Sequence, residues 1–231
     1  MKTIGLIGGM SWESTQEYYR IINETVKETL GGFHSAKIIM YSVDFEEIEK
    51  LQHQGKWGEL TELMIDIAKR IEKSGADFVL ICANTMHKMA DEVQKNIKIP
   101  LLNVIDLTAE KIREKGLKKI GLLGTKFTME EDFYKRRLTE KYGFDVIIPT
   151  EGERRIIHDV IFNELCLGEI KQSSKEQFKK IIENLVARGA GGIILGCTEI
   201  PLLVKQEDFE VSLFDTMMIH AKSAVEYAIK K

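Results

Sequence analysis

A cysteine at the end of an apolar run is the residue of this chain best suited to chemistry. The run GAGGIILGCTEI, over residues 189–200, contains Cys197 followed by a hydroxyl and a carboxylate. An earlier run, SGADFVLICANT over residues 74–85, has the same pattern, and aligning the two Gly-Ala pairs places Ala83 at the position of Cys197. A thiol can transfer a proton or attack a substrate, whereas a methyl group can do neither. The two runs predict matching strand ends, only one of which has a reactive side chain.

The expected surroundings of Cys197 favour its ionised form. At the carboxyl end of a strand, the thiol meets backbone N–H groups of the next element, and these favour a thiolate. The alternative is a buried structural cysteine, which is the ordinary state of this residue. We expect Cys82 in the core, because adjacent strand residues face opposite ways and Ala83 is assigned to the site.

Polar residues follow several other expected strands. Asn84 and Thr85 offer an amide and a hydroxyl beside helix N–H groups, which suits either a carboxylate ligand or a helix cap. The turn GGMS at 8–11 either brings backbone close to a ligand or only tightens a strand-to-helix connection. Thr125 and Thr128 either add hydroxyls to the site or cap the next helix. The sequence leaves these alternatives open.

Strands and helices are expected to alternate along the chain. Short apolar runs predict strands at 3–7, 37–43, 78–82, 100–104 and 119–125. Helical spacing of apolar residues predicts helices at 14–30, 60–73, 86–96 and 216–230. This alternation predicts an α/β fold with mostly parallel sheets. Ligands of such sheets bind beyond the carboxyl ends of the strands, where the polar segments fall.

An internal duplication organises these elements. TIGLIGG at 3–9 recurs as KIGLLGT at 119–125, which is 116 residues later. Cys197 follows Ala83 by a similar 114 residues. A weaker echo, LLNV and LFDT, is separated by 112 residues. Similar separations in separate segments predict a repeated structural unit.

The duplication predicts two pseudo-symmetric lobes that share one cleft. We assign residues 1–107 together with 215–231 to an N-terminal lobe. Residues 108–214 form the expected C-terminal lobe. In this arrangement the last helix crosses back onto the first lobe.

Composition excludes several classes of protein. The 231 residues have a formal net charge of −3 and no basic cluster of the kind that binds nucleic acid. The chain contains no run of about 18 apolar residues, so the sequence predicts no membrane span. The three cysteines lack CxxC spacing, and the five histidines lack metal-ligand spacing. We expect a cytoplasmic protein without a metal, nucleic-acid or membrane partner.

Three motifs together resemble the aspartate/glutamate racemase family. They are GGMSWES at 8–14, NTMHK at 84–88 and GCTE at 196–199, and the likeness is strongest to the bacterial broad-specificity amino-acid racemases. The resemblance implies a cofactor-independent enzyme that acts on an amino acid between two lobes. One residue of each lobe faces the substrate Cα, and the two remove and return its proton from opposite sides. A homodimer is compatible with this resemblance.

The resemblance also implies roles for particular residues. Cys197 corresponds to the second-lobe thiol, and Ala83 occupies the first-lobe catalytic position, where relatives have Cys or Thr. Glu164 stands where some relatives that act on acidic substrates have lysine, which argues against aspartate or glutamate as the preferred substrate. The implied substrate-binding residues are Met10 (through its backbone), Gln52, Asn84, Thr85, Thr125, Thr198 and Glu199.

Three functions are compatible with a single thiol. In the first, the chain is an amino-acid racemase in which Cys197 works from one face, with water or a hydroxyl such as that of Thr85 on the other. In the second, it decarboxylates or isomerises a small dicarboxylate, which needs one proton donor. In the third, it binds an amino acid or another small carboxylate without catalysis. We favour the racemase, whose activity Ala83 would leave impaired or one-sided.

Overall fold

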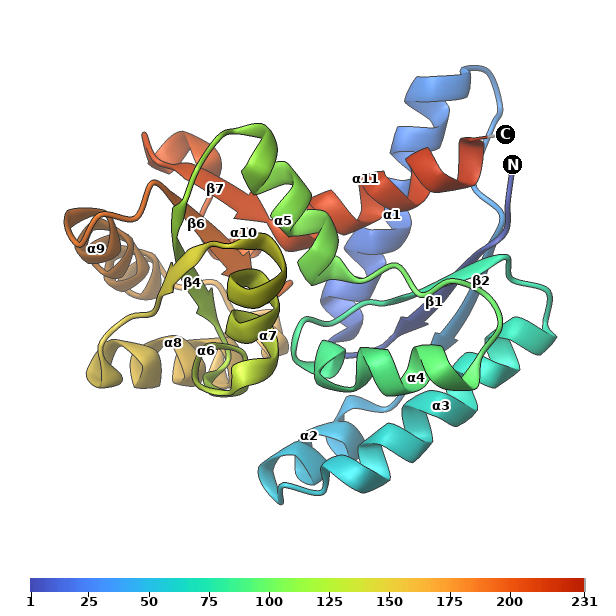
Figure 1. Cartoon of the computed structure of the whole chain (residues 1–231), viewed down its shortest axis with the longest axis horizontal. Coiled ribbons are helices and arrows are strands. Elements are labelled where there is room, and N and C mark those ends of the chain that lie inside the picture. The colour runs from blue at the N-terminus through green and yellow to red at the C-terminus, as the bar shows by residue number, and fades with distance from the viewer. Residues whose placement is uncertain (231) are drawn as a thin grey trace. The chain divides into compact units, whose positions relative to one another are not determined.

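A computed structural model describes residues 1–230, which form two compact units (Figure 1). Unit 1 comprises Met1–Asn103 and the chain from His220 onward, and unit 2 comprises Val104–Ile219. Helix α11 (Thr216–Ile229) begins in unit 2 and ends in unit 1. No helix within residues 1–230 has the length and apolar character that a membrane span requires.

Unit 1 is built on a three-stranded parallel sheet with the order β2-β1-β3. Its strands are β1 (Ile4–Gly8), β2 (Ile38–Ser42) and β3 (Phe78–Ile81). Its helices are α1 (Trp12–Leu30), α2 (Phe45–His53), α3 (Trp57–Lys73), the 3-10 helix η1 (Thr85–Met89), α4 (Ala90–Asn96) and the end of α11.

The core of unit 1 follows from the spacing of apolar residues on α3. Leu60, Met64, Ile67 and Ile71 recur at helical spacing and are all buried against the sheet. Each such side chain contributes roughly 1.5–3 kcal/mol on burial. This packing fixes the sheet and the positions of the strand ends.

Unit 2 is built on a four-stranded parallel sheet with the order β5-β4-β6-β7. Its strands are β4 (Lys119–Gly124), β5 (Asp145–Ile147), β6 (Gly192–Gly196) and β7 (Ser212–Asp215). Its α-helices are α5 (Val104–Glu114), α6 (Lys126–Glu130), α7 (Asp132–Arg136), α8 (Glu151–Asn163), α9 (Gln172–Ala187), α10 (Ile200–Leu203) and the start of α11. Three short helices complete it: η2 (Arg137–Lys141, a π-helix), η3 (Leu165–Leu167) and η4 (Gln206–Asp208).

The two sheets repeat the same register. Ile4 pairs with Phe78 in unit 1, and Ile120 pairs with Gly192 in unit 2. These pairs are separated by the same 116 and 114 residues as the sequence echoes. The α/β fold with two parallel sheets that the sequence predicts is confirmed, and the ends of β3 and β6 are equivalent positions.

The strand predicted at 100–104 is wrong in extent. It is reduced to an isolated bridge between Leu101 and Val79, because Pro100 has no N–H to donate and α5 already begins at Val104. The helix predicted at 86–96 forms in two pieces, η1 and α4. The bridge corresponds in register to the pairing of Leu213 with Ile193 in unit 2, so the third and weakest echo also has a structural counterpart.

Candidate active site

The end of β6 brings a thiol, a hydroxyl and a carboxylate together. Cys197 Sγ donates to Glu199 Oε2 at 2.8 Å. The Thr198 hydroxyl donates to Glu199 Oε1 and Oε2 at 3.1 and 3.0 Å. All three side chains are buried. The carboxylate is thus held by two neighbours on its own strand end, and it is the acceptor for the thiol proton.

The surroundings of Cys197 favour the thiol, contrary to the expectation of a thiolate. Burial raises the pKa of Cys197 well above its ordinary value, and the negative charge of Glu199 raises it further. The one backbone hydrogen bond that lowers the pKa is outweighed. Backbone N–H groups alone would favour the thiolate, but the Glu199 carboxylate two residues along the chain contacts the sulfur and opposes its ionisation.

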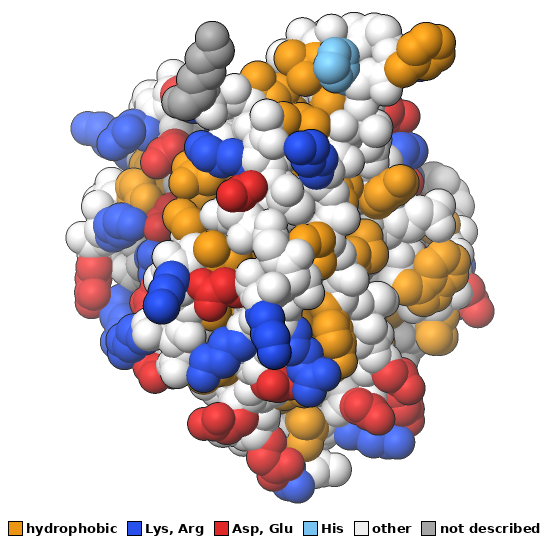
Figure 2. All heavy atoms as spheres, turned by 90° about the vertical axis from the view of Figure 1, so that its right-hand side faces the viewer, with side chains coloured by type: hydrophobic (Ala, Val, Ile, Leu, Met, Phe, Trp, Pro, Cys, Tyr) orange, Lys and Arg blue, Asp and Glu red, His pale blue; other side chains and the backbone are white. Residues whose placement is uncertain are grey.

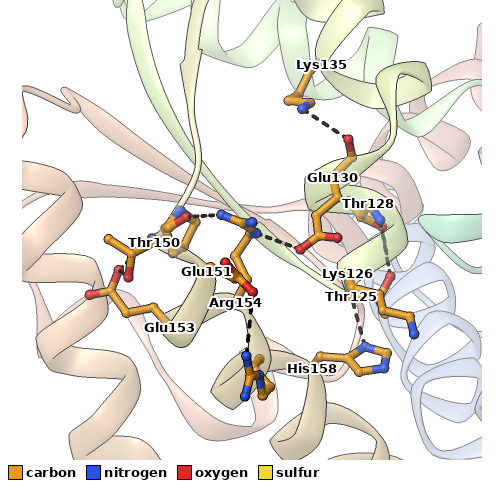
Figure 3. Close-up of polar contacts among 12 residues, drawn as sticks. Thr125, Lys126, Thr128, Glu130, Lys135, Thr150, Glu151, Glu153, Arg154 and His158 are labelled. Carbon is orange, nitrogen blue, oxygen red and sulfur yellow. Dashed lines mark hydrogen bonds and ion pairs between the residues drawn. The ribbon is translucent and has the colours of Figure 1, made fainter.

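Thr125 lies at the end of β4 and caps α6 (Figure 3). Its Oγ1 accepts a hydrogen bond from the Thr128 N–H at 3.3 Å, and the two hydroxyl oxygens are 3.4 Å apart. The Lys126 N–H, in the same turn, donates to His158 Nδ1 at 3.4 Å. The capping role expected of Thr125 as one alternative is therefore present, and its hydroxyl is buried at the strand end.

A polar hollow of about 300 Å³ lies between α6 and α8, beside Thr125 (Figure 3). Its charges are balanced by ion pairs. Arg154 Nε contacts Glu130 Oε1 at 2.7 Å, and an Arg155 nitrogen lies 3.6 Å from Glu151 Oε1. Its charged walls thus pair largely with one another.

Glu164, the position where some relatives have lysine, is occupied with neighbours of its own unit. The Ser174 hydroxyl donates to Glu164 Oε2 at 2.6 Å, and Lys171 Nζ lies 3.6 Å from Oε1. The carboxylate thus lies at the start of α9 and helps to hold it against η3.

The end of β3 presents the counterpart segment without an acid or base at residue 83. Ala83, Asn84 and Thr85 are all buried, and Ala83 is 8% exposed, as is Cys197. Asn84 precedes η1 without a side-chain cap hydrogen bond, so capping is not what its amide does. His87 is tied to this segment, since its ring Nδ1 lies 2.8 Å from the Ala83 carbonyl oxygen.

Two further expected site residues belong to unit 1. Met10 is buried in the core against α2 and α3. Gln52 of α2 is buried, and its Nε2 donates to the sulfur of Met86 at 3.2 Å. Gln52 is therefore held beside η1, the helix that follows Asn84.

Gly9, just before Met10, has a φ of +91°, and a Cβ there would lie 2.4 Å from the Val43 carbonyl oxygen. The turn therefore needs glycine for structural reasons alone.

A buried histidine network in unit 1 has no counterpart in the sequence analysis. The Tyr18 hydroxyl lies 2.9 Å from His220 Nδ1, and His220 Nε2 lies 2.8 Å from the Leu102 carbonyl oxygen. The rings of His220 and His87 meet edge to face with centroids 5.7 Å apart. Burial lowers the pKa of His220 to about 3, helped by nearby His87, so the ring is neutral. The sequence signals this network only by the four-residue spacing of Ala83 and His87, which brings the His87 ring to the Ala83 carbonyl.

The remaining titratable groups do not add a second reactive centre to these strand ends. Cys82 is fully buried, as predicted, and burial raises the pKa of its thiol. Among residues 1–230, no three His, Cys, Asp or Glu side chains are grouped as a metal site requires. Cys197 and the Glu199 carboxylate that it contacts thus distinguish the end of β6 from the end of β3.

Comparison with known proteins identifies the family. The model of the Asp/Glu/Hydantoin racemase family matches residues 7–224. The broad specificity amino-acid racemase RacX of Bacillus subtilis is 25% identical over 96% of each chain. The crystal structure of an Asp/Glu racemase candidate from Yersinia pestis is 51% identical over the whole of both chains, with a TM-score of 0.92. That of an aspartate racemase homologue from Pyrococcus horikoshii OT3 is 38% identical over the same extent, with a TM-score of 0.86. The chain therefore belongs to the Asp/Glu/hydantoin racemase family of isomerases.

Proposed function

We propose that this chain is a cofactor-independent amino-acid racemase in which Cys197 transfers the Cα proton from one face of the substrate. The observation that carries the proposal is the 2.8 Å contact between Cys197 Sγ and Glu199 Oε2. It gives the thiol a proton acceptor inside a buried strand end. Relatives named as racemases, RacX among them, support the reaction class.

The proton inventory of the Cys197 and Glu199 pair explains how a thiol with a raised pKa becomes a base. Glu199 takes the thiol proton, and the resulting thiolate takes the proton from the substrate Cα. In the reverse direction the thiol returns a proton to Cα, and Glu199 returns its own to the sulfur. Proton transfer by a positioned side chain accelerates a reaction about 10²–10⁴-fold.

The opposite face of the substrate is served differently. The Ala83 side chain has no exchangeable proton, so a water molecule or the Thr85 hydroxyl stands in for the missing acid. Both are weaker acids than a thiol, and inversion is therefore slower than exchange at the Cys197 face. The chain acts as a one-sided or impaired racemase.

The substrate carboxylate is assigned to polar groups at the strand ends. Asn84, Thr85 and Thr198 supply amide and hydroxyl donors, and the family resemblance adds Thr125 and the backbone of Met10 to this set. Buried donors of this kind stabilise the negative charge that develops on the substrate when the proton leaves Cα. The assignment of both strand ends to one substrate rests on the family resemblance.

The side chain of the substrate is contacted by Gln52 and selected by Glu164. The Glu164 carboxylate favours neutral or basic amino acids over aspartate and glutamate, because like charges repel in a buried site. A cytoplasmic location belongs to the same proposal, since the sparse cysteines suit a reducing compartment. A homodimeric state is proposed on the family resemblance alone.

The proposal is tested by isotope exchange on a panel of amino acids. Each L and D amino acid is incubated with the protein in D₂O, and Cα deuterium and enantiomer ratio are followed by mass spectrometry and chiral chromatography. We expect deuterium to enter one enantiomer faster than inversion occurs. Both reactions should be lost in Cys197→Ser. Release of carbon dioxide would show a decarboxylase instead. Binding without exchange for every amino acid of the panel would show a binding protein.

A further inference from the structure

The turn after β3 is held by a histidine side chain. The His87 ring Nδ1 lies 2.8 Å from the Ala83 carbonyl oxygen, and His87 is 4% exposed. A carbonyl oxygen can only accept a hydrogen bond, so the proton of this contact is on Nδ1. The peptide that joins Ala83 to Asn84 is planar, and a hydrogen bond to its carbonyl therefore fixes the direction of the Asn84 N–H as well. His87 thus sets the orientation of this peptide at the strand end.

The equivalent turn of unit 2 is held in a different way. The Cys197 carbonyl accepts a hydrogen bond from the Ile200 N–H at 3.2 Å. Pro201 stands 114 residues after His87, at the equivalent position, and has neither an N–H nor a polar side chain. A backbone donor therefore holds the turn after β6, whereas the turn after β3 is held by an imidazole. A single substitution can remove the imidazole.

A second buried histidine supports the ring of His87. The His220 ring meets it edge to face, with centroids 5.7 Å apart. His220 Nε2 donates to the Leu102 carbonyl at 2.8 Å, so in the neutral ring Nδ1 accepts from the Tyr18 hydroxyl at 2.9 Å. Leu102 is itself bonded to β3, since its N–H donates to the Val79 carbonyl at 3.0 Å. The pair of imidazoles is therefore anchored to the same strand whose end His87 orients.

This network is buried, in contrast to the charged surface of the molecule. Charged side chains are spread over the face on the side of the chain ends (Figure 2), whereas Tyr18, His87 and His220 are at most 4% exposed. Hydrogen bonds are stronger in a buried, low-dielectric place, and a buried acceptor that loses its donor is left unsatisfied. The orientation of the Ala83 carbonyl should therefore depend closely on the His87 donor.

We propose that His87 is a positioning residue of the substrate site. Through the peptide between Ala83 and Asn84, it orients Asn84 and Thr85, the residues assigned above to the substrate carboxylate. In this role His87 neither contacts the substrate nor transfers a proton. The inference rests on the proposed function, because the orientation of Asn84 and Thr85 matters for catalysis only if the substrate carboxylate binds to them.

Two substitutions of His87 separate the hydrogen bond from packing. His87→Asn keeps a donor in place, because the asparagine Nδ2 is joined to Cγ as the histidine Nδ1 is, whereas His87→Leu has none. We expect His87→Leu to lower kcat/KM for Cα exchange about 10–100-fold, and His87→Asn to stay within about threefold of the wild type. Asparagine fills less of the buried space than leucine, so a role in packing alone would reverse this order.

The control for these rates is His34→Leu, the same change at an exposed position of unit 1, which should leave kcat/KM unchanged. A reversed order of His87→Asn and His87→Leu, or equal rates in the two, would overturn the role of His87 while leaving the racemase proposal in place.

Nuclear magnetic resonance tests the same contact without a substrate. Long-range proton–nitrogen spectra should show the ring proton of His87 on Nδ1 and that of His220 on Nε2. The backbone amide signals of Asn84 and Thr85 should move in His87→Leu and largely return in His87→Asn. A His87 ring without a proton on Nδ1, or equal displacement of these signals in both variants, would overturn the inference. If the wild type exchanges no amino acid of the panel, the racemase proposal fails, and these spectra still decide whether His87 orients the turn.

Discussion

The end of β3 in unit 1 and the end of β6 in unit 2 hold equivalent places in two sheets of the same register. Their equivalent residues, Ala83 and Cys197, are equally buried, so exposure does not distinguish them. The chemistry does. Cys197 contacts the Glu199 carboxylate, whereas the Ala83 methyl group has no proton to exchange, and the Ala83 carbonyl oxygen lies 2.8 Å from His87 Nδ1. A duplicated backbone thus positions two sites without giving them the same reactivity.

Removing the thiol should have the largest effect on this comparison, because it makes the two strand ends alike. We expect Cys197→Ser to lower Cα deuterium exchange about 10³–10⁴-fold, since a serine hydroxyl is a far weaker acid than a thiol and its alkoxide is inaccessible at neutral pH. The initial rate of exchange in D₂O measures the loss. Cys82→Ala, one residue from Ala83 in the other unit, is the control and should change the rate less than tenfold. Equal losses in both variants would show that Cys197 is not the proton carrier.

A proton carrier at residue 83 should make the end of β3 resemble the end of β6, so that both strand ends have a reactive side chain. We expect Ala83→Thr to raise the rate of inversion about 10²-fold relative to exchange, because a hydroxyl now stands at the second face. Ala83→Val has the same shape without the hydroxyl, so it isolates chemistry from packing. Chiral chromatography separates inversion from exchange. A gain in Ala83→Val as large as that in Ala83→Thr would indicate a steric cause.

The sequence predicted these two ends better than it predicted their surroundings. The echoes between 3–9 and 119–125 placed Ala83 and Cys197 at equivalent strand ends, because apolar runs and glycines constrain strands locally. The thiolate expectation was wrong for a physical reason. The Glu199 side chain folds back onto Cys197, and this conformation depends on the three-dimensional surroundings that a linear pattern does not encode.

Contacts between residues far apart in the chain could not be predicted from the sequence either, because they depend on tertiary packing. Tyr18 and His220 are 202 residues apart and meet only because α1 and the end of α11 pack in unit 1. The strand predicted at 100–104 failed at its two ends, where a proline and the start of α5 limit pairing to Leu101. Local sequence patterns therefore predict most strands and helices, whereas tertiary packing sets the surroundings, and with them the pKa values, of Cys197 and His220.

Neutralising Glu199 tests the feature that most separates the end of β6 from the end of β3. We expect Glu199→Gln to lower the exchange rate about 30-fold, because the amide cannot take the thiol proton. The negative charge of Glu199 contributes to the raised pKa of Cys197, so its removal lowers that pKa. The pH profile of Cys197 alkylation by iodoacetamide should move to lower pH. Glu164→Gln, in the same unit, should leave the profile in place, and an unmoved profile in Glu199→Gln would assign Glu199 a purely structural role.

The smallest expected effect is on stability, whose dependence on pH should differ between the two units. Burial lowers the pKa of His220 in unit 1 from its ordinary 6.5 to about 3, so the unfolded chain binds a proton near pH 6.5 that the folded unit does not. The free energy of unfolding of unit 1 should therefore fall by about 1.4 kcal/mol between pH 7.5 and 5.5.

Unit 2 has no such loss from its partly buried Asp106. Burial alone would raise the pKa of Asp106, but hydrogen bonds from Arg137 and Lys141 outweigh it and lower the pKa below 3.8. The stability from that group is complete above pH 3.8 and is lost only as pH falls through the lower, folded value. Hydrogen exchange at pH 5.5 should thus show faster opening of β1 and β3 than of β4 and β6, relative to pH 7.5. His220→Gln should remove that pH dependence from unit 1, because glutamine does not titrate, while lowering its stability at both pH values. Equal sensitivity of the two sheets in the wild type would mean that His220 is not held neutral by its surroundings.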